Sequence, residues 1–211
     1  MNVVIVDYNQ GNISSIKRAF KLLGVEVICS HDKTVIEGAE ALVMPGVGNF
    51  RTAMNYINNN NIDSVLNHSV HKKKIPVLGI CLGMQLMTNF SEEGEVDGLG
   101  WIQARVEKII PKDKENYKVP NIGWTLLNKG INSELLDGID CNKSPFYFCH
   151  SYAVRKISQS GLYTSSFYYD GEYVSIFECE NIFGVQFHPE KSHSAGVDLL
   201  SNFLSKVRNR K

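Results

Sequence analysis

The 211-residue sequence has no hydrophobic run long enough to span a membrane and no excess of either charge. A transmembrane helix needs about 20 consecutive apolar residues, and no segment approaches that length. The 22 Lys and Arg residues balance the 22 Asp and Glu residues, whereas a nucleic-acid-binding domain is typically basic. Residues 1–7 also lack the features of a signal peptide. The sequence therefore predicts a soluble cytoplasmic protein that binds neither nucleic acid nor a membrane.

Cysteine is scarce and widely spaced. The five cysteines are an odd number, and they form no Cys-x-x-Cys pair. This pattern argues against a disulfide framework and against a structural zinc site. Most of the five are expected to be small buried hydrophobes in a reducing compartment, but Cys81 has a different sequence context. They are Cys29, Cys81, Cys141, Cys149 and Cys179.

The first 90 residues alternate between short apolar runs and segments of helical periodicity. Strands are predicted at residues 3–6, 25–29, 41–44 and 75–80, and helices over 13–23, around Met54 and Ile57, over 65–70 and over 84–87. Strands that alternate with helices predict a parallel sheet with helices on both faces. Such sheets bind ligands beyond the carboxyl ends of their strands, so the residues that follow each strand are candidates for a site.

The second half of the chain is rich in β-strand signals. Apolar segments with short turns predict antiparallel strands that extend or flank the sheet, and residues 195–207 predict a closing helix. The strand segments are residues 104–110, 147–149, 163–169, 173–179 and 182–187. No linker separates the halves, so a single domain over residues 1–211 is expected. The predicted fold class is α/β, an open and mostly parallel sheet flanked by helices, with an antiparallel extension in the second half.

Residues 79–83, Gly-Ile-Cys-Leu-Gly, place Cys81 between a predicted buried strand and a helical stretch. A nucleophile flanked by small residues at such a turn is typical of the nucleophile elbow, in which a sharp turn exposes the reactive atom. The following helix would point its positive N-terminal end at the thiol and favour the thiolate. Cys81 is thus a candidate nucleophile. A buried cysteine in an ordinary strand-to-helix turn is the alternative on this segment alone.

A thiol nucleophile needs a base, and the candidate is His188 in the sequence Phe-His-Pro-Glu. Glu190 is placed to hold the imidazole in its productive tautomer, as the acid does in other triads. A lone histidine at a strand end is often incidental, but its combination with Glu190 and with the elbow predicts a catalytic triad of Cys81, His188 and Glu190. The chain order is no obstacle, because triads are recognised by geometry.

A third motif, Pro-Gly-Val-Gly-Asn-Phe at residues 45–50, follows the predicted strand at 41–44. A Gly-rich loop at this place can turn a backbone N–H group into the site. Together with the N–H group of Leu82 it would form an oxyanion hole, in which one donor is worth on the order of 10²–10³ in rate. An ordinary Pro-Gly turn is the alternative, so the loop is informative only in combination with the other motifs.

The three motifs, in this order and spacing, resemble the class I (triad-type) glutamine amidotransferase family, and within it the glutaminase subunits of imidazole glycerol phosphate synthases. The elbow and the His-Pro-Glu segment are typical of the superfamily. The opening Val-Asp-Tyr-Asn-Gln-Gly-Asn at residues 6–12 and the Pro-Asn-Ile-Gly-Trp segment at 120–124 indicate the subfamily. The similarity runs essentially from end to end, and it includes residues 45–48, 79–86, 98–100, 147–152 and 186–192.

The resemblance implies that Cys81 attacks the side-chain amide of glutamine, that ammonia leaves, and that water then hydrolyses the glutamyl thioester. No metal and no organic cofactor is expected, because a thiol and a histidine suffice for amide hydrolysis. By the same resemblance, a set of residues around the nucleophile would hold the glutamine or its oxyanion. These residues are Gly46, Val47, Gly48, Leu82, Gln85, Ser151 and Tyr152.

The resemblance also implies a protein partner. In this family the ammonia passes into a (β/α)8-barrel synthase (cyclase) subunit and reacts there with a phosphorylated ribonucleotide in histidine biosynthesis. Trp124, Tyr147 and Lys191 match positions at that subunit interface, so a heterodimer is expected. Without the resemblance, an aromatic residue such as Trp124 would be assigned to the core.

Two segments depart from the family pattern. The interface segment usually reads Pro-His-x-Gly-Trp-Asn and here carries Asn121 and Thr125, and the loop after the Pro-Gly-Val-Gly segment usually has a small residue and here has Asn49. Both lie where partner recognition would be set. A paralogous glutaminase that supplies ammonia to a sugar-aminating synthase for surface glycans is therefore an alternative. The complete triad argues against a non-catalytic binding subunit, and the match at Gln85 argues against a general cysteine peptidase.

Overall fold

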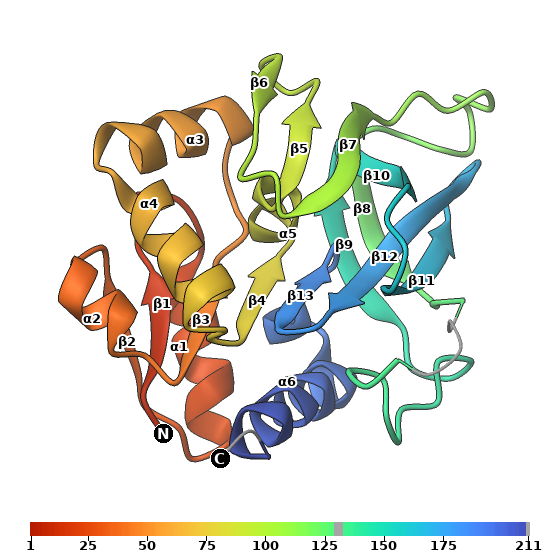
Figure 1. Cartoon of the computed structure of the whole chain (residues 1–211). Helices are drawn as coiled ribbons and strands as arrows, with labels where there is room; N and C mark the ends of the chain where they lie inside the picture. Colours follow the sequence, from red (N-terminus) through yellow and green to blue (C-terminus); the bar gives the residue numbers. More distant parts are fainter. Residues whose placement is uncertain (129–132, 210–211) are drawn as a thin grey trace.

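A computed structural model describes residues 1–128 and 133–209 of the chain. A seven-stranded mixed sheet runs through its centre (Figure 1). The strand order is β11-β12-β13-β4-β3-β1-β2. Five neighbouring strands of this sheet are parallel, in the flavodoxin-like order. They are β1 (Val3–Val6), β2 (Val27–Ser30), β3 (Ala41–Met44), β4 (Val77–Ile80) and β13 (Ile182–Val185).

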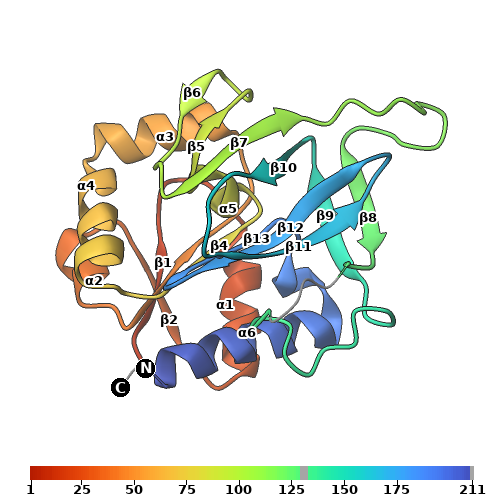
Figure 2. The same ribbon diagram turned by 45° about the vertical axis from the view of Figure 1, so that its right-hand side comes forward.

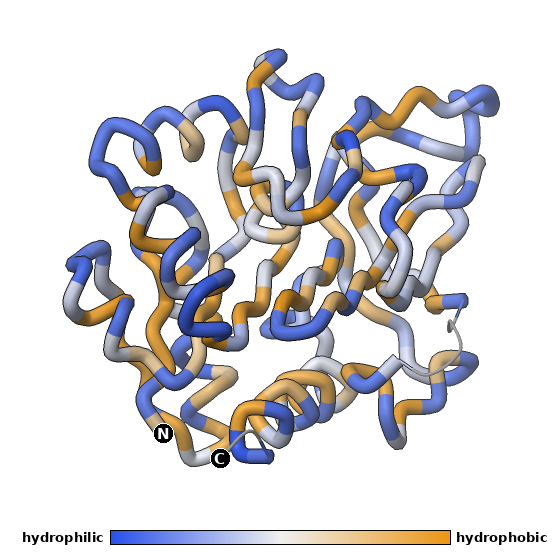
Figure 3. The backbone as a smooth tube through the Cα atoms, in the orientation of Figure 1, coloured by the Kyte–Doolittle hydropathy of each residue, from blue (hydrophilic) through white to orange (hydrophobic). Residues whose placement is uncertain are grey.

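The two faces of this sheet carry separate hydrophobic cores, because successive side chains of a strand point to opposite faces. In β1, Val3 and Ile5 pack with α1 and α6 on one face, whereas Val4 and Val6 pack with α2 to α5 on the other. Figure 2 shows α6 running beneath the sheet. Figure 3 shows hydrophobic and hydrophilic stretches alternating along this helix. The helices are α1 (Ile13–Leu22), α2 (Lys33–Glu37), α3 (Phe50–Asn59), α4 (Ile62–Asn67), α5 (Leu82–Leu86) and α6 (His193–Arg208), with a π-helical turn, η1 (His68–Lys72), after α4.

The second half of the chain contains strands at the predicted segments, but their pairings are not all antiparallel, since β7 (Ile102–Lys108) pairs in parallel with β5 (Thr88–Ser91). Strands β11 (Tyr163–Tyr168) and β12 (Glu172–Cys179) extend the sheet in antiparallel fashion. The segment predicted at residues 182–187 was expected to be antiparallel, and β13 is antiparallel to β12 but parallel to β4. Its continuous apolar sequence suits this central position, since strands buried on both faces have no polar alternation. The α/β fold class, with a mostly parallel sheet and an antiparallel extension, is confirmed.

Two smaller sheets pack beside the main one, and they include strands at the segments predicted at residues 104–110 and 147–149. The four-stranded sheet has the order β10-β7-β5-β6, and the two-stranded sheet pairs β8 with β9. Their strands are β5 (Thr88–Ser91), β6 (Val96–Asp97), β7 (Ile102–Lys108), β8 (Asn121–Thr125), β9 (Phe146–His150) and β10 (Tyr152–Ile157). Within residues 1–128 and 133–209, no helix is long and apolar enough to cross a membrane.

The parallel arrangement gathers the candidate residues at one edge of the sheet. The carboxyl ends of parallel strands meet at the same edge, and β3, β4 and β13 are direct neighbours. The loop that begins at Pro45 follows β3, Cys81 follows β4, and Gln186 follows β13. Residues from three distant parts of the sequence are thus brought together by strand pairing alone.

Candidate active site

Cys81 occupies the turn between β4 and α5. Its φ of 48° and ψ of −104° lie outside the regions that non-glycine residues ordinarily adopt, and such strained residues cluster at functional sites. Gly83 allows this turn, because a Cβ atom there would lie 2.1 Å from the carbonyl oxygen of Met44. The Cys81 side chain is buried against the main sheet, and only 6% of the residue is exposed. This is the geometry that the elbow motif predicted.

His188 and Glu190 approach Cys81 from the segment that follows the adjacent strand, β13. Nδ1 of His188 lies 2.8 Å from Oε1 of Glu190, and both side chains are almost fully buried. Because Nδ1–H donates to the carboxylate, Nε2 is the ring nitrogen left to hydrogen-bond with Cys81. Burial alone would lower the pKa of His188, but the charge and hydrogen bond of Cys81, together with Glu190, raise that pKa to about 10. The arrangement places an imidazole that holds its proton strongly beside Cys81.

The Pro-Gly-Val-Gly loop is pressed against the elbow. A Cβ atom on Gly46 would lie 1.8 Å from the carbonyl oxygen of Ile80 and 2.9 Å from Cβ of Cys81, so only glycine fits there. The hydroxyl of the fully buried Tyr8 donates to the carbonyl oxygen of Pro45 and fixes the start of the loop. The backbone of this loop can therefore reach the reacting atoms.

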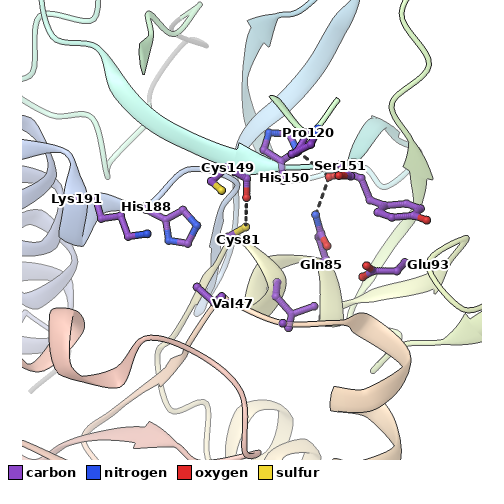
Figure 4. A pocket seen from close by; sticks show the side chains of 14 residues that line it. Val47, Cys81, Gln85, Glu93, Pro120, Cys149, His150, Ser151, His188 and Lys191 are labelled. Carbon is purple, nitrogen blue, oxygen red and sulfur yellow. Dashed lines mark hydrogen bonds between the residues drawn. The ribbon is translucent and has the colours of Figure 1, made fainter. Parts of the chain in front are cut away.

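A cavity of about 270 Å³ opens in front of Cys81 (Figure 4). His188 and Lys191 lie at one side of it, and Gln85 and Glu93 lie at the other. The structure brings all seven predicted substrate residues to the cavity wall, which they share with Cys81 and His188. Those seven are Gly46, Val47, Gly48, Leu82, Gln85, Ser151 and Tyr152.

Residues 4–207 match the family described as glutamine amidotransferase class-I. The chain belongs to this family. Its resemblance to amidotransferases, read from three motifs, is thereby confirmed. A solved structure described as a glutamine amidotransferase superposes with a TM-score of 0.73, covering 98% of this chain and 100% of that one at 19% sequence identity, which supports the same fold.

Curated relatives carry a more specific description. Imidazole glycerol phosphate synthase subunit HisH 2 of Methanococcus maripaludis is 40% identical over 205 residues, which are 97% of this chain and 100% of that protein. Subunit HisH of the same synthase from Leptospira borgpetersenii is 38% identical over 202 residues, which are 95% of this chain and 98% of that protein. The amidotransferase chain is thus similar to these subunits over their whole length.

Glu93 is a cavity residue of the amidotransferase that sequence reasoning missed. Its Oε2 accepts a hydrogen bond of 2.8 Å from the backbone N–H of Phe50, at the start of α3. The carboxylate therefore lies in the cavity near Gln85. In the sequence it stands in Glu-Glu-Gly-Glu at residues 92–95, which reads as a solvated turn. Only the three-dimensional arrangement distinguishes it from its neighbours.

His150 lies at the cavity wall in a neutral state. Its Nδ1 is 2.8 Å from the carbonyl oxygen of Tyr152, which can only accept, so Nδ1 carries the proton. Its Nε2 then accepts from the side-chain amide of Asn121 at 3.3 Å. Burial lowers the pKa of His150 to about 4, the hydrogen bond to Tyr152 opposes that shift, and His188 adds to it. The sequence contained His150 only as part of a family motif.

The three residues predicted at the partner interface lie side by side on the surface of the amidotransferase. The Trp124 and Tyr147 rings are 5.6 Å apart, and Nζ of Lys191 lies 5.5 Å from the Tyr147 ring. Trp124 also stacks on His193, with ring centroids 4.8 Å apart. Trp124 is 45% exposed, so the alternative that assigned it to the core is wrong.

The two departures from the family pattern have local structural roles. The side chain of Asn121 is buried and donates to His150, so it does not face outward from β8. Asn49 is the N-cap of α3, where its Oδ1 accepts from the backbone N–H of Thr52 at 3.1 Å. Asparagine is among the preferred N-cap residues. Neither side chain alters the exposed aromatic surface.

Proposed function

We propose that this chain is the glutaminase subunit of imidazole glycerol phosphate synthase, acting in the cytoplasm in histidine biosynthesis. It hydrolyses glutamine to glutamate and ammonia and passes the ammonia to a (β/α)8-barrel cyclase partner, and residues 1–211 act as one amidotransferase domain. The observation that carries the chemistry is the buried arrangement of Cys81, His188 and Glu190. The pathway is supported by full-length similarity to relatives that are named as subunits of this synthase.

The first chemical step forms a thioester. The thiolate of Cys81 attacks the side-chain carbonyl carbon of glutamine, and the N–H group of Leu82 stabilises the developing oxyanion together with the loop at residues 46–48. Leu82 opens α5, and the first N–H groups of a helix have no intrahelical acceptor. The His188 imidazolium gives its proton to the departing nitrogen, and ammonia leaves.

The second step clears the enzyme. His188, now neutral, takes a proton from water, and the hydroxide attacks the thioester carbonyl. The tetrahedral intermediate then collapses, glutamate departs, and the thiolate of Cys81 is released beside the His188 imidazolium. Glu190 keeps Nδ1 protonated throughout, so that Nε2 always faces the reacting atoms. Neither step requires a metal or an organic cofactor.

The far side of the cavity suits the amino-acid end of glutamine. The Nε2 group of Gln85 donates to Tyr152 O at 2.9 Å and to Gln186 Oε1 at 3.0 Å, so both of its hydrogens are used. Its Oε1 is left to accept from the α-ammonium group, and the Glu93 carboxylate adds a negative charge nearby. The backbone of Ser151 and Tyr152 lines the same wall. We assign these groups to recognition of the substrate head.

The partner would cover the surface around Trp124, Tyr147 and Lys191. Aromatic residues that remain largely exposed in a monomer are typical anchors of protein interfaces. A sugar-aminating synthase is the alternative partner, and the departures at Asn121 and Asn49 gave rise to it. Because those side chains serve a buried hydrogen bond and a helix cap, they give the alternative no specific support.

Glutamate release tests this function. The purified chain is assayed alone, with an imidazole glycerol phosphate cyclase subunit, and with that subunit plus its ribonucleotide ligand, with the Cys81→Ala variant as the blank. We expect stimulation of at least tenfold in the last mixture, on the order of an allosteric coupling of 1–3 kcal/mol. Absence of stimulation, with Cys81 still labelled by a glutamine-like electrophile, would reject the histidine pathway and direct the search to carbohydrate acceptors.

A further inference from the structure

Gln186 lies directly beside the nucleophile because of strand register. Val185 at the end of β13 pairs with Ile80 at the end of β4, so Gln186 and Cys81 are the next residues on two parallel neighbours. The backbone N–H of Cys81 donates to the carbonyl oxygen of Val185 at 2.7 Å, which locks the two chain segments together. Gln186 is fully buried, yet the two chemical steps above assign it no part.

The side-chain amide of Gln186 points its nitrogen at the sulfur. Nε2 of Gln186 lies 3.5 Å from Sγ of Cys81. The orientation is fixed from the other side, because Nε2 of Gln85 donates to the carbonyl oxygen of Tyr152 and also to Oε1 of Gln186. A carbonyl oxygen can only accept, so it is the nitrogen of Gln85 that faces both groups, and the oxygen of Gln186 must face Gln85. The amide nitrogen of Gln186, with its N–H groups, is therefore directed at Cys81.

An N–H group directed at the sulfur distinguishes the two protonation states of Cys81. The thiolate accepts hydrogen bonds, and a donor at this position favours it over the thiol. The neutral thiol can donate to the carbonyl oxygen of Cys149, which lies 4.0 Å from Sγ, and its sulfur accepts from Gln186 only weakly. His188 supplies a second donor to the thiolate. Gln186 thus supports the anion independently of the base.

We infer that Gln186 is a positioning residue of the glutaminase reaction, which holds the thiolate of Cys81 and is itself oriented by Gln85. The inference rests on the proposed function, since it assigns Gln186 to the same nucleophile. Gln186 also connects two parts of the site through one continuous set of hydrogen bonds. One part is the cavity wall at Gln85, where the substrate would bind, and the other is the reacting sulfur of Cys81. A substrate bound at Gln85 would therefore meet a nucleophile that is already aligned.

The pH profile of Cys81 alkylation by iodoacetamide measures this effect without glutamine. In Gln186→Met the side chain keeps a similar volume but loses the donor. We expect alkylation at pH 7 to fall roughly tenfold, while the plateau rate at high pH stays unchanged, because only the thiolate reacts. Peptide mass analysis, with Cys81→Ser as the blank, assigns the label among the five cysteines. Parallel assays of glutamate release are expected to show a fall in kcat with little change in KM.

Two further variants make the comparison decisive. Gln85→Met removes the group that orients Gln186 and acts from α5, so it should shift the alkylation profile in the same direction even if Gln186→Met does not fold. Ser175→Ala is the matched control. Ser175 lies on β12, and its carbonyl oxygen accepts a hydrogen bond from the backbone N–H of Gln186. Its buried hydroxyl has no hydrogen-bond partner, so the substitution removes no contact to Gln186. It should leave the profile unchanged.

The outcomes separate the two proposals. An unshifted profile in either folded methionine variant, or an equal shift in Ser175→Ala, would overturn the role of Gln186. A wild-type chain that is alkylated at Cys81 but releases no glutamate with any partner would instead contradict the proposed function, and the alkylation comparison would still stand.

Discussion

The cavity at Cys81 and the outer face of β8 and β9 are built in opposite ways. In the cavity, Cys81 is 6% exposed, His188 is 1% exposed, and their polar groups are tied into hydrogen bonds. On the outer face, Ile122 and Trp124 of β8 and Leu126, the next residue after that strand, are 59%, 45% and 46% exposed. We call these three residues the apolar stripe. A period of two places them on the same face.

The difference shows which part of the molecule is complete in itself. Buried polar groups that satisfy one another hold a site rigid, so the cavity needs no partner to place its residues. An exposed apolar surface favours association, so the stripe gains contacts only when it is covered. Substitutions at Cys81, His188 and His150 test the buried site, and a substitution at Trp124 tests the stripe.

Cys81→Ala should remove the chemistry and leave the stripe intact. We expect glutamine hydrolysis to fall by roughly 10⁴-fold or more, because removing a nucleophile abolishes the covalent route. The partner should still bind and should still use ammonia supplied in solution. Glutamate release and ammonia-dependent product formation, measured side by side, check both halves. Full glutaminase activity in this variant would show that another residue is the nucleophile.

His188→Ala should leave the thiol in place without its base. A loss of about 10²–10⁴-fold in kcat is expected, which is the usual contribution of general acid–base catalysis. Steady-state glutamate release with the partner present measures it, and binding of the partner serves as the control. A loss under tenfold would remove His188 from the mechanism.

His150 should make the buried site sensitive to acid. Its pKa of about 4 in the folded chain lies below the ordinary value of 6.5, so between these values the unfolded chain binds a proton that the folded chain does not. The contribution of His150 to the free energy of unfolding is therefore fully present above pH 6.5, and it is lost progressively as the pH falls toward 4. Urea unfolding at pH 7 and at pH 5 measures how much the free energy of unfolding falls between these two pH values. This fall should be smaller by roughly 2 kcal/mol in His150→Asn than in the wild type. Equal losses in both proteins would contradict the buried neutral state.

Trp124→Ala should alter the stripe and spare the site. Because Trp124 is 45% exposed, we expect the free energy of unfolding to change by less than about 1 kcal/mol. Partner-stimulated glutamate release should fall about tenfold through weaker binding, as for a moderate hot-spot residue. Titration of the partner against activity separates affinity from turnover. An unchanged titration curve would place the interface elsewhere.

The parallel half of the fold could be predicted from sequence because each strand is short, apolar and clearly ended. Pro45 and Gly46 mark the end of β3, and Gly24 follows α1. The elbow at Cys81 could be predicted for the same reason, since a nucleophile between two glycines is a local pattern. Local patterns of this kind need no knowledge of which strands pair.

The rest depends on pairing between distant segments. The parallel contact of β13 with β4 was not predicted, because the intervening chain contains several strands and no pattern marks the crossover. The position of Gln186 follows from that contact, and the position of Glu93 follows from its hydrogen bond to the start of α3. A glutamate in a turn or a glutamine after a strand carries no local signal. Trp124 was similarly ambiguous until its exposure on β8 was known.

The pairing of β4 with β13 also has a consequence for how the protein is made. The ribosome completes the segment with Cys81 long before it reaches His188, and the strand that positions the base enters the sheet between β4 and β12. A nascent chain that ends before β13 therefore holds Cys81, the proposed nucleophile, without His188, the proposed base. With these roles, we expect ammonia release to begin only when almost the whole polypeptide has emerged and folded.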